Sequence, residues 1–185
     1  MLVAHWDDLV GDGVYDKEKS VVQIWHGLDY LKPTIENSQS YAVISSLGKT
    51  ATEGIYLDCG YGQYLDGTTK SWCDPRKAWR DIYNFKVPAE YAGNERILGG
   101  EAAMWSELVD DTNILSRVFP RASALAEMLW TSDEQKEGKN PYGRINQHVN
   151  LLKGRGVGAQ PLQPKICEFL KGKGRDGACH PYSSS

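Results

Sequence analysis

Four short, mostly apolar runs set the fold class of this chain. They occupy residues 3–6, 20–25, 41–46 and 96–100. Their apolar residues are mostly consecutive rather than alternating with polar ones, which is typical of strands covered on both faces. Stretches of helical character separate or follow the runs, so the order strand, loop, helix recurs about four times. This order predicts an α/β protein with a parallel sheet and right-handed crossovers.

Two short helices are predicted between the strand runs. In residues 29–38, Leu31 and Ile35 stand four positions apart, as on one face of a helix. Residues 75–83 bring four apolar side chains to one face: Ala78, Trp79, Ile82 and Tyr83. The connection from residue 46 to residue 97 is long, and a long loop in a compact domain is more often functional than not.

Two longer helices are predicted towards the C-terminus. Residues 116–130 are expected to form one continuous helix with an apolar stripe of Phe119, Ala122, Leu125, Ala126 and Leu129. The second begins with Asn140 as its cap and Pro141 at its first position, and it ends at Gly154. Its apolar stripe consists of Ile145, Val149 and Leu152.

Aromatic residues and carboxylates recur where the predicted strands end. The groups are Trp6-Asp7-Asp8, Trp25-His26, Tyr56-Leu57-Asp58 and Trp105-Ser106-Glu107. The carboxyl ends of parallel strands meet at one edge of a sheet, where ligands bind. One such tryptophan alone is more often a core residue, but fourfold recurrence favours a pocket. Six tryptophans and ten tyrosines against three phenylalanines also suit a sugar, because these rings add a polar edge to an apolar face.

Charge and hydropathy exclude several classes of function. The formal net charge of −3 gives no basic footprint for nucleic acid. No apolar run approaches the roughly 18–20 residues that span a membrane, and the N-terminus lacks the basic start and apolar stretch of a signal peptide. Gly11-Asp12-Gly13 lacks the further glycine of a dinucleotide loop. We therefore expect no nucleic-acid partner, no membrane partner, no cofactor and no metal.

The four cysteines fall into two local pairs, Cys59 with Cys73 and Cys167 with Cys179. An even count at short spacings favours two disulfides and an oxidising compartment. Zinc is the competing interpretation, and it is weakened because neither pair has the Cys-x-x-Cys spacing and His180 stands alone nearby.

One stretch carries a family signature. Residues 98–113 read LGGEAAMWSELVDDTN, and residues 119–130 read FPRASALAEMLW. They resemble the last barrel strand, its loop and the following helix of the β-N-acetylhexosaminidases, glycoside hydrolase family 20. Shorter matches follow the family order at Val22–Trp25, Tyr56–Asp58, Arg155–Val157 and Gln160-Pro161. The cysteine pairs resemble disulfides of the secreted fungal-type enzymes, which implies a secreted or a lysosomal or vacuolar location.

The resemblance implies the fold and the site. Residues 1–160 would be the C-terminal half, strands 5–8, of a (β/α)8 TIM barrel, completed by another chain or by a second copy. Residues 161–185 would be a disulfide-pinned tail. The implied activity is retaining, substrate-assisted hydrolysis of terminal β-linked N-acetylglucosamine or N-acetylgalactosamine. Trp6, Trp25 and Trp105 would box the sugar, and Trp79 would be a further platform. Tyr56 would hydrogen-bond the acetamido group, and Asp58 and Glu107 would bind ring hydroxyls.

The sequence departs from the family at the catalytic residues. The family's general acid and its partner Asp stand in a Gly-Asp-Glu motif after the fourth barrel strand, and these 185 residues contain no such motif. The substrate-binding Arg of the first strand is also absent. Three interpretations follow: half of an enzyme that needs the other half, a lectin-like sugar-binding protein that pairs with its own copy, or a fragment without independent function. In each case we expect the isolated chain to be inactive.

Overall fold

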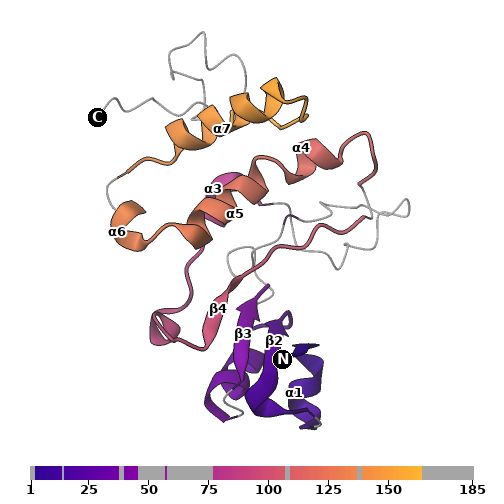
Figure 1. Ribbon diagram of the computed structural model, residues 1–185, viewed down its shortest axis with the longest axis vertical. Coiled ribbons are helices and arrows are strands. Elements are labelled where there is room, and N and C mark those ends of the chain that lie inside the picture. Colours follow the sequence, from indigo (N-terminus) through magenta and orange to yellow (C-terminus); the bar gives the residue numbers. More distant parts are fainter. Residues whose placement is uncertain are drawn as a thin grey trace, which may run out of the picture.

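All four predicted strands form in the computed structural model, which describes residues 3–13, 15–37, 40–45, 57, 77–106, 109–136 and 139–163. They are β1 (Val3–Trp6), β2 (Ser20–Ile24), β3 (Tyr41–Ile44) and β4 (Ile97–Gly100). All neighbours are parallel, in the order β1-β2-β3-β4. The predicted parallel α/β sheet is therefore confirmed, and Figure 1 shows its strands below a layer of helices.

The two faces of this sheet are unequally covered. Along β2, Val22 and Ile24 are fully buried, whereas Val21 and Gln23 are half-buried. The same alternation holds along β3. The prediction of strands covered on both faces was therefore wrong, because one face of the sheet stays half-open. Apolar side chains occupy both faces of β2, so the sequence pattern alone did not reveal the difference.

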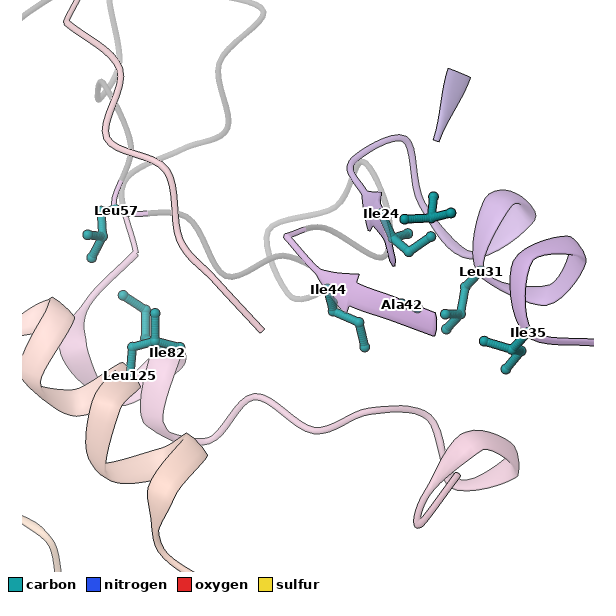
Figure 2. Close-up of a cluster of buried hydrophobic side chains, with 9 residues drawn as sticks. Ile24, Leu31, Ile35, Ala42, Ile44, Leu57, Ile82 and Leu125 are labelled. Atoms are coloured by element: carbon teal, nitrogen blue, oxygen red, sulfur yellow. The ribbon is translucent and has the colours of Figure 1, made fainter. Parts of the chain in front are cut away.

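The buried face of the sheet packs against the segment that follows β2. This segment is α2 (Leu28–Lys32) continued by a π-helical turn, η2 (Pro33–Asn37). Leu31 and Ile35 are buried there, as predicted. Figure 2 shows them beside Ile24 and Ile44. A second part of the same cluster, formed by Leu57, Ile82 and Leu125, links the sheet to the helical layer.

The predicted helix over residues 116–130 is in fact two helices, α4 (Ile114–Val118) and α5 (Arg121–Trp130). Pro120 interrupts them, because proline has no N–H and disfavours helical backbone in the residue before it. Phe119 is accordingly extended. The predicted stripe is only partly confirmed: Leu125 is buried and Ala122 packs on the core, whereas Ala126 and Leu129 are exposed and the other buried residues of α5 are Arg121 and Ala124.

The rest of the helical layer is α3 (Trp79–Tyr83), which packs on α5, and α7 (Tyr142–Gly154), which also contacts α5. Helix α7 begins one residue later than predicted. The Asn140 side-chain oxygen still accepts a hydrogen bond from the Tyr142 N–H at 2.9 Å. The predicted Ile145 and Val149 are buried.

The shorter elements are α1 (Asp8–Asp12), η1 (Lys17–Lys19), η3 (Ala89–Tyr91) and α6 (Asp133–Lys136). Within the described ranges, no helix has the length and apolar character needed to cross a membrane.

A polar cluster ties the three main helices together. Arg144 on α7 donates from Nε to the Glu127 carboxylate on α5 at 2.9 Å, and Tyr83 on α3 donates to the same carboxylate oxygen at 3.2 Å. The hydrogen bond to Glu127 raises the pKa of the Arg144 guanidinium. Burial, followed by the Glu127 carboxylate, raises the pKa of the Tyr83 hydroxyl above 10.0.

This cluster predicts a loss of stability at alkaline pH. The folded chain keeps the Tyr83 proton to a higher pH than the unfolded chain, so above the unfolded pKa of about 10 unfolding releases a proton and its free energy falls as pH rises. Urea unfolding of the chain should show a steeper decline between about pH 9 and pH 11 than unfolding of Tyr83→Phe. Identical slopes would contradict this prediction.

Candidate functional site

Three of the predicted tryptophans come together at the carboxyl ends of the strands. Trp6 is the last residue of β1, Trp25 follows β2, and Trp105 lies beyond β4. The rings of Trp6 and Trp25 stack with centroids 6.5 Å apart and planes 6° apart. Trp105 meets Trp25 edge-on, with centroids 5.8 Å apart and planes 69° apart. Trp25 is therefore the central ring of an aromatic group, here called the tryptophan trio.

A cavity of about 280 Å³ lies beside Trp6 on the half-open face of the sheet. Its lining is mostly apolar with a few polar groups: Ala4, His5, Trp6, Val21, Gln23, Val43 and Glu101. Such a mixture is usual for small-molecule sites. Trp6 itself is 48% exposed, so it has ring surface available to a ligand.

A polar network crosses the half-open face at the cavity. The Gln23 amide donates hydrogen bonds to the Glu101 carboxylate and to the Ser45 hydroxyl, the latter at 3.2 Å. The Ser45 hydroxyl in turn donates to Glu101. The sequence analysis did not single out Gln23 or Ser45 as site residues. A polar residue in an otherwise apolar strand run could have indicated them.

Asp7, one of the carboxylates at the predicted strand ends, makes contacts that the sequence does not predict. Its side chain is fully buried. One carboxylate oxygen accepts the backbone N–H groups of Trp25 and His26, each at 2.7 Å. The other oxygen lies 2.8 Å from Nδ1 of His26. The carboxylate therefore joins the ends of β1 and β2, and only the folded sheet reveals these contacts.

Asp7, Asp8 and His26 offer potential metal ligands, with ligand atoms all within 4.8 Å of one another. Both oxygens of Asp7 are already engaged in the hydrogen bonds described above. Asp8 is exposed and lies 3.4 Å from Nδ1 of His26. The contacts of Asp7 and His26 are therefore explained by hydrogen bonds that join β1 and β2, without a metal ion.

The structure does not bring Trp79 to the trio. Its ring is only 6% exposed and lies in a separate buried cluster of the helical layer, 6.3 Å from the ring of Tyr142. The Arg80 guanidinium lies over the same ring at 4.7 Å. The structure thus places Trp79 in the helical layer, away from the trio.

Several other predicted residues lie outside the described ranges. They are Tyr56, Asp58, Glu107 and the four cysteines Cys59, Cys73, Cys167 and Cys179. Leu57, between two of them, is buried, and its backbone N–H donates to the Ala103 carbonyl at 3.1 Å. This bond holds Leu57 against the chain that leaves β4.

Comparison with known proteins decides the family. Residues 2–133 match the model of the glycosyl hydrolase family 20 catalytic domain. The chain belongs to glycosyl hydrolase family 20. One relative, a probable beta-hexosaminidase of Arthroderma benhamiae, is 36% identical over 195 residues, covering 88% of this chain and 31% of the relative. A chitooligosaccharidolytic beta-N-acetylglucosaminidase of Ostrinia furnacalis is 34% identical, covering 84% of this chain and 25% of the relative.

Solved structures of family 20 share the fold. The exo beta-N-acetylglucosaminidase of Vibrio harveyi, in complex with N-acetylglucosamine, superposes with a TM-score of 0.65 at 21% identity, covering 87% of this chain and 25% of that one. The beta-N-acetylhexosaminidase of Streptomyces coelicolor gives 0.60, covering 89% and 33%. The four-stranded sheet with its helices is therefore a partial (β/α) barrel. The chain spans about a third or less of the length of these relatives.

Proposed function

We propose that this chain supplies the sugar-binding wall of a β-N-acetylhexosaminidase that releases terminal β-linked N-acetylglucosamine or N-acetylgalactosamine. The tryptophan trio carries the proposal, because it places three aromatic rings at the strand ends of a family 20 barrel. Aromatic faces suit the apolar side of a sugar ring, and the indole N–H suits its hydroxyl rim. The names of the relatives given above, all hydrolases, support the same activity and lend no support to the lectin-like alternative.

The proposed chemistry is substrate-assisted. The acetamido oxygen of the substrate attacks the anomeric carbon while the leaving-group oxygen takes a proton from a general acid; water then opens the cyclic intermediate with net retention. In this scheme the trio encloses the sugar and the acetamido methyl, and Tyr56 donates a hydrogen bond to the acetamido carbonyl. Asp58 and Glu107 accept hydrogen bonds from ring hydroxyls. Excluding water from this wall strengthens each of these interactions.

The general acid in this proposal comes from strands outside these 185 residues. The sequence contains no Gly-Asp-Glu motif, and among the described strands β1 pairs only with β2 and β4 only with β3. The half-open face and these two free edges are what a complementary barrel half would cover. A second copy fits less well, because it would bring a second Glu101 into the same enclosed lumen, where two carboxylates repel.

Reconstitution tests the proposal. The chain would be mixed with a polypeptide that supplies the other four strands of a family 20 barrel, and release of the chromophore from a β-N-acetylglucosaminide would be followed. We expect no turnover from either half alone and clear turnover from the mixture. A matched mixture, in which the added half carries Gln in place of the acid Glu, should stay silent. No gain of activity in a mixture shown to associate would contradict the proposal.

We also propose disulfides Cys59–Cys73 and Cys167–Cys179 and a secreted or a lysosomal or vacuolar location. The support is the local pairing of the cysteines in the sequence. A peptide map under non-reducing conditions checks both bonds, and four free thiols would contradict them. The domain division, with residues 161–185 as a tail, likewise remains a proposal, since residues 164–185 lie outside the described ranges.

A further inference from the structure

We infer that Asp7 is a positioning residue that holds Trp6 and Trp25 in their stacked arrangement, an inference that rests on the proposed function for its bearing on sugar binding. Asp7 follows Trp6 directly at the end of β1. Its carboxylate reaches the end of the neighbouring strand, where it accepts the backbone N–H of Trp25 at 2.7 Å. One side chain thus fixes the chain position of both rings.

The sheet by itself does not extend this far. The last residue pair in the β1–β2 register is Trp6 with Gln23, and β2 ends at Ile24. The backbone N–H of Asp7 adds one bond, to the Gln23 carbonyl at 3.1 Å. Beyond that point the carboxylate takes over from the backbone ladder. Trp25 therefore leaves the sheet in a direction that Asp7 helps to determine.

A carboxylate is well suited to this place. It is acceptor-only and has room for several donors, and here it meets three: two backbone N–H groups and Nδ1 of His26. Charge-assisted hydrogen bonds are shorter and stronger than neutral ones. The side chain is 0% exposed, so removing it would leave buried backbone donors without their acceptor.

The angle between the Trp6 and Trp25 rings is sensitive to the hydrogen bonds of the Asp7 carboxylate. The planes of Trp6 and Trp25 differ by only 6°, so a small change in backbone direction at Trp25 changes the stack. A displacement of about 1 Å in a positioned group can cost an active site about 100-fold in rate. The apolar core that holds β2 in place is formed by Val22 and Ile24 with their neighbours.

The test compares Asp7→Ala with a matched control, Ser20→Ala, on the neighbouring strand β2. Ser20 is also 0% exposed, and its hydroxyl donates to the Asp16 carbonyl at 2.6 Å, but it lies at the opposite end of β2. Ser20→Ala thus removes a polar contact of another fully buried side chain, at the end of β2 that lies away from the trio. Asp7→Asn is the conservative variant, since its amide retains an oxygen that accepts the backbone N–H groups of Trp25 and His26.

The first readout does not depend on any sugar. Two stacked indole rings couple electronically and give paired circular-dichroism bands of opposite sign, which Trp6→Phe would assign in the 185-residue chain. We expect Asp7→Ala to lose this signal, and Ser20→Ala and Asp7→Asn to keep it. An unchanged signal in Asp7→Ala, or an equal loss in Ser20→Ala, would overturn the inference. If Asp7→Ala does not fold, Asp7→Glu serves instead: it keeps the charge but is one methylene longer, and an unaltered signal there would overturn the inference equally.

The second readout is calorimetric titration with N-acetylglucosamine. We expect the dissociation constant of Asp7→Ala to rise about tenfold, with little change in Ser20→Ala. Equal affinity of Asp7→Ala and the unmodified chain would overturn the inference. The unmodified chain could bind no sugar and still show the paired bands. That result would contradict the proposed sugar-binding function, and the first readout would still decide whether Asp7 positions the two rings.

Discussion

Replacing Trp25 by alanine is expected to weaken the binding of N-acetylglucosamine by about 30-fold or more, which corresponds to about 2 kcal/mol, the usual size of a buried aromatic hot spot. Trp25 is the central ring of the trio, with Trp6 stacked on one side and Trp105 edge-on to it. Its removal therefore takes away one wall of the site and both aromatic pairs, each pair being worth about 0.5–1.5 kcal/mol. Isothermal titration of the chain with the sugar measures the effect.

Trp130 provides the matched control. It is the last residue of α5 and is 90% exposed, so Trp130→Ala removes the same side chain without removing a packed contact. We expect it to leave both the affinity and the unfolding free energy within about 0.5 kcal/mol of those of the unmodified chain. If Trp25→Ala bound the sugar as tightly as Trp130→Ala does, the trio would not be the sugar-binding wall.

Replacing Ile24 by alanine is expected to lower the free energy of unfolding by about 2–5 kcal/mol, the range for deleting a buried Ile side chain. Ile24 is fully buried between the sheet and α2, beside Leu31 and Ile44 (Figure 2). The cost includes the lost packing around the cavity as well as the lost burial. Urea unfolding followed by circular dichroism measures it, and a change below about 1 kcal/mol would contradict the packing described here.

Two valines on the same strand make this test directional. Val22 is fully buried against α2, whereas its neighbour Val21 points to the half-open face and is half-buried. Both substitutions to alanine remove the same two methyl groups, so Val22→Ala should cost about twice as much as Val21→Ala or more. Equal costs would mean that both faces are buried in solution, as they would be if a second copy closed the barrel.

Local pattern was enough to predict the strands and most of the helices. A run such as that at residues 20–25 needs only its own apolar, β-branched residues to specify a strand. The error in the helix over residues 116–130 was also local, because Pro120 was visible in the sequence and its effect on the residue before it is general. The burial of Arg121 and Ala124 in place of Ala126 and Leu129 was set by what packs on α5, which no local pattern shows.

The sequence by itself determined which residues stand at the ends of the strands, and in a parallel sheet those ends meet; this brought Trp6, Trp25 and Trp105 to one place. Only the tertiary structure decided that Trp79 is buried among helices, that one face of the sheet is half-open, and that Asp7 joins two strands. These features depend on contacts between segments far apart in the chain, such as Asp7 with Trp25 and His26. No periodicity within a single segment encodes them, because a hydrogen bond across strands exists only once the register of both strands is set.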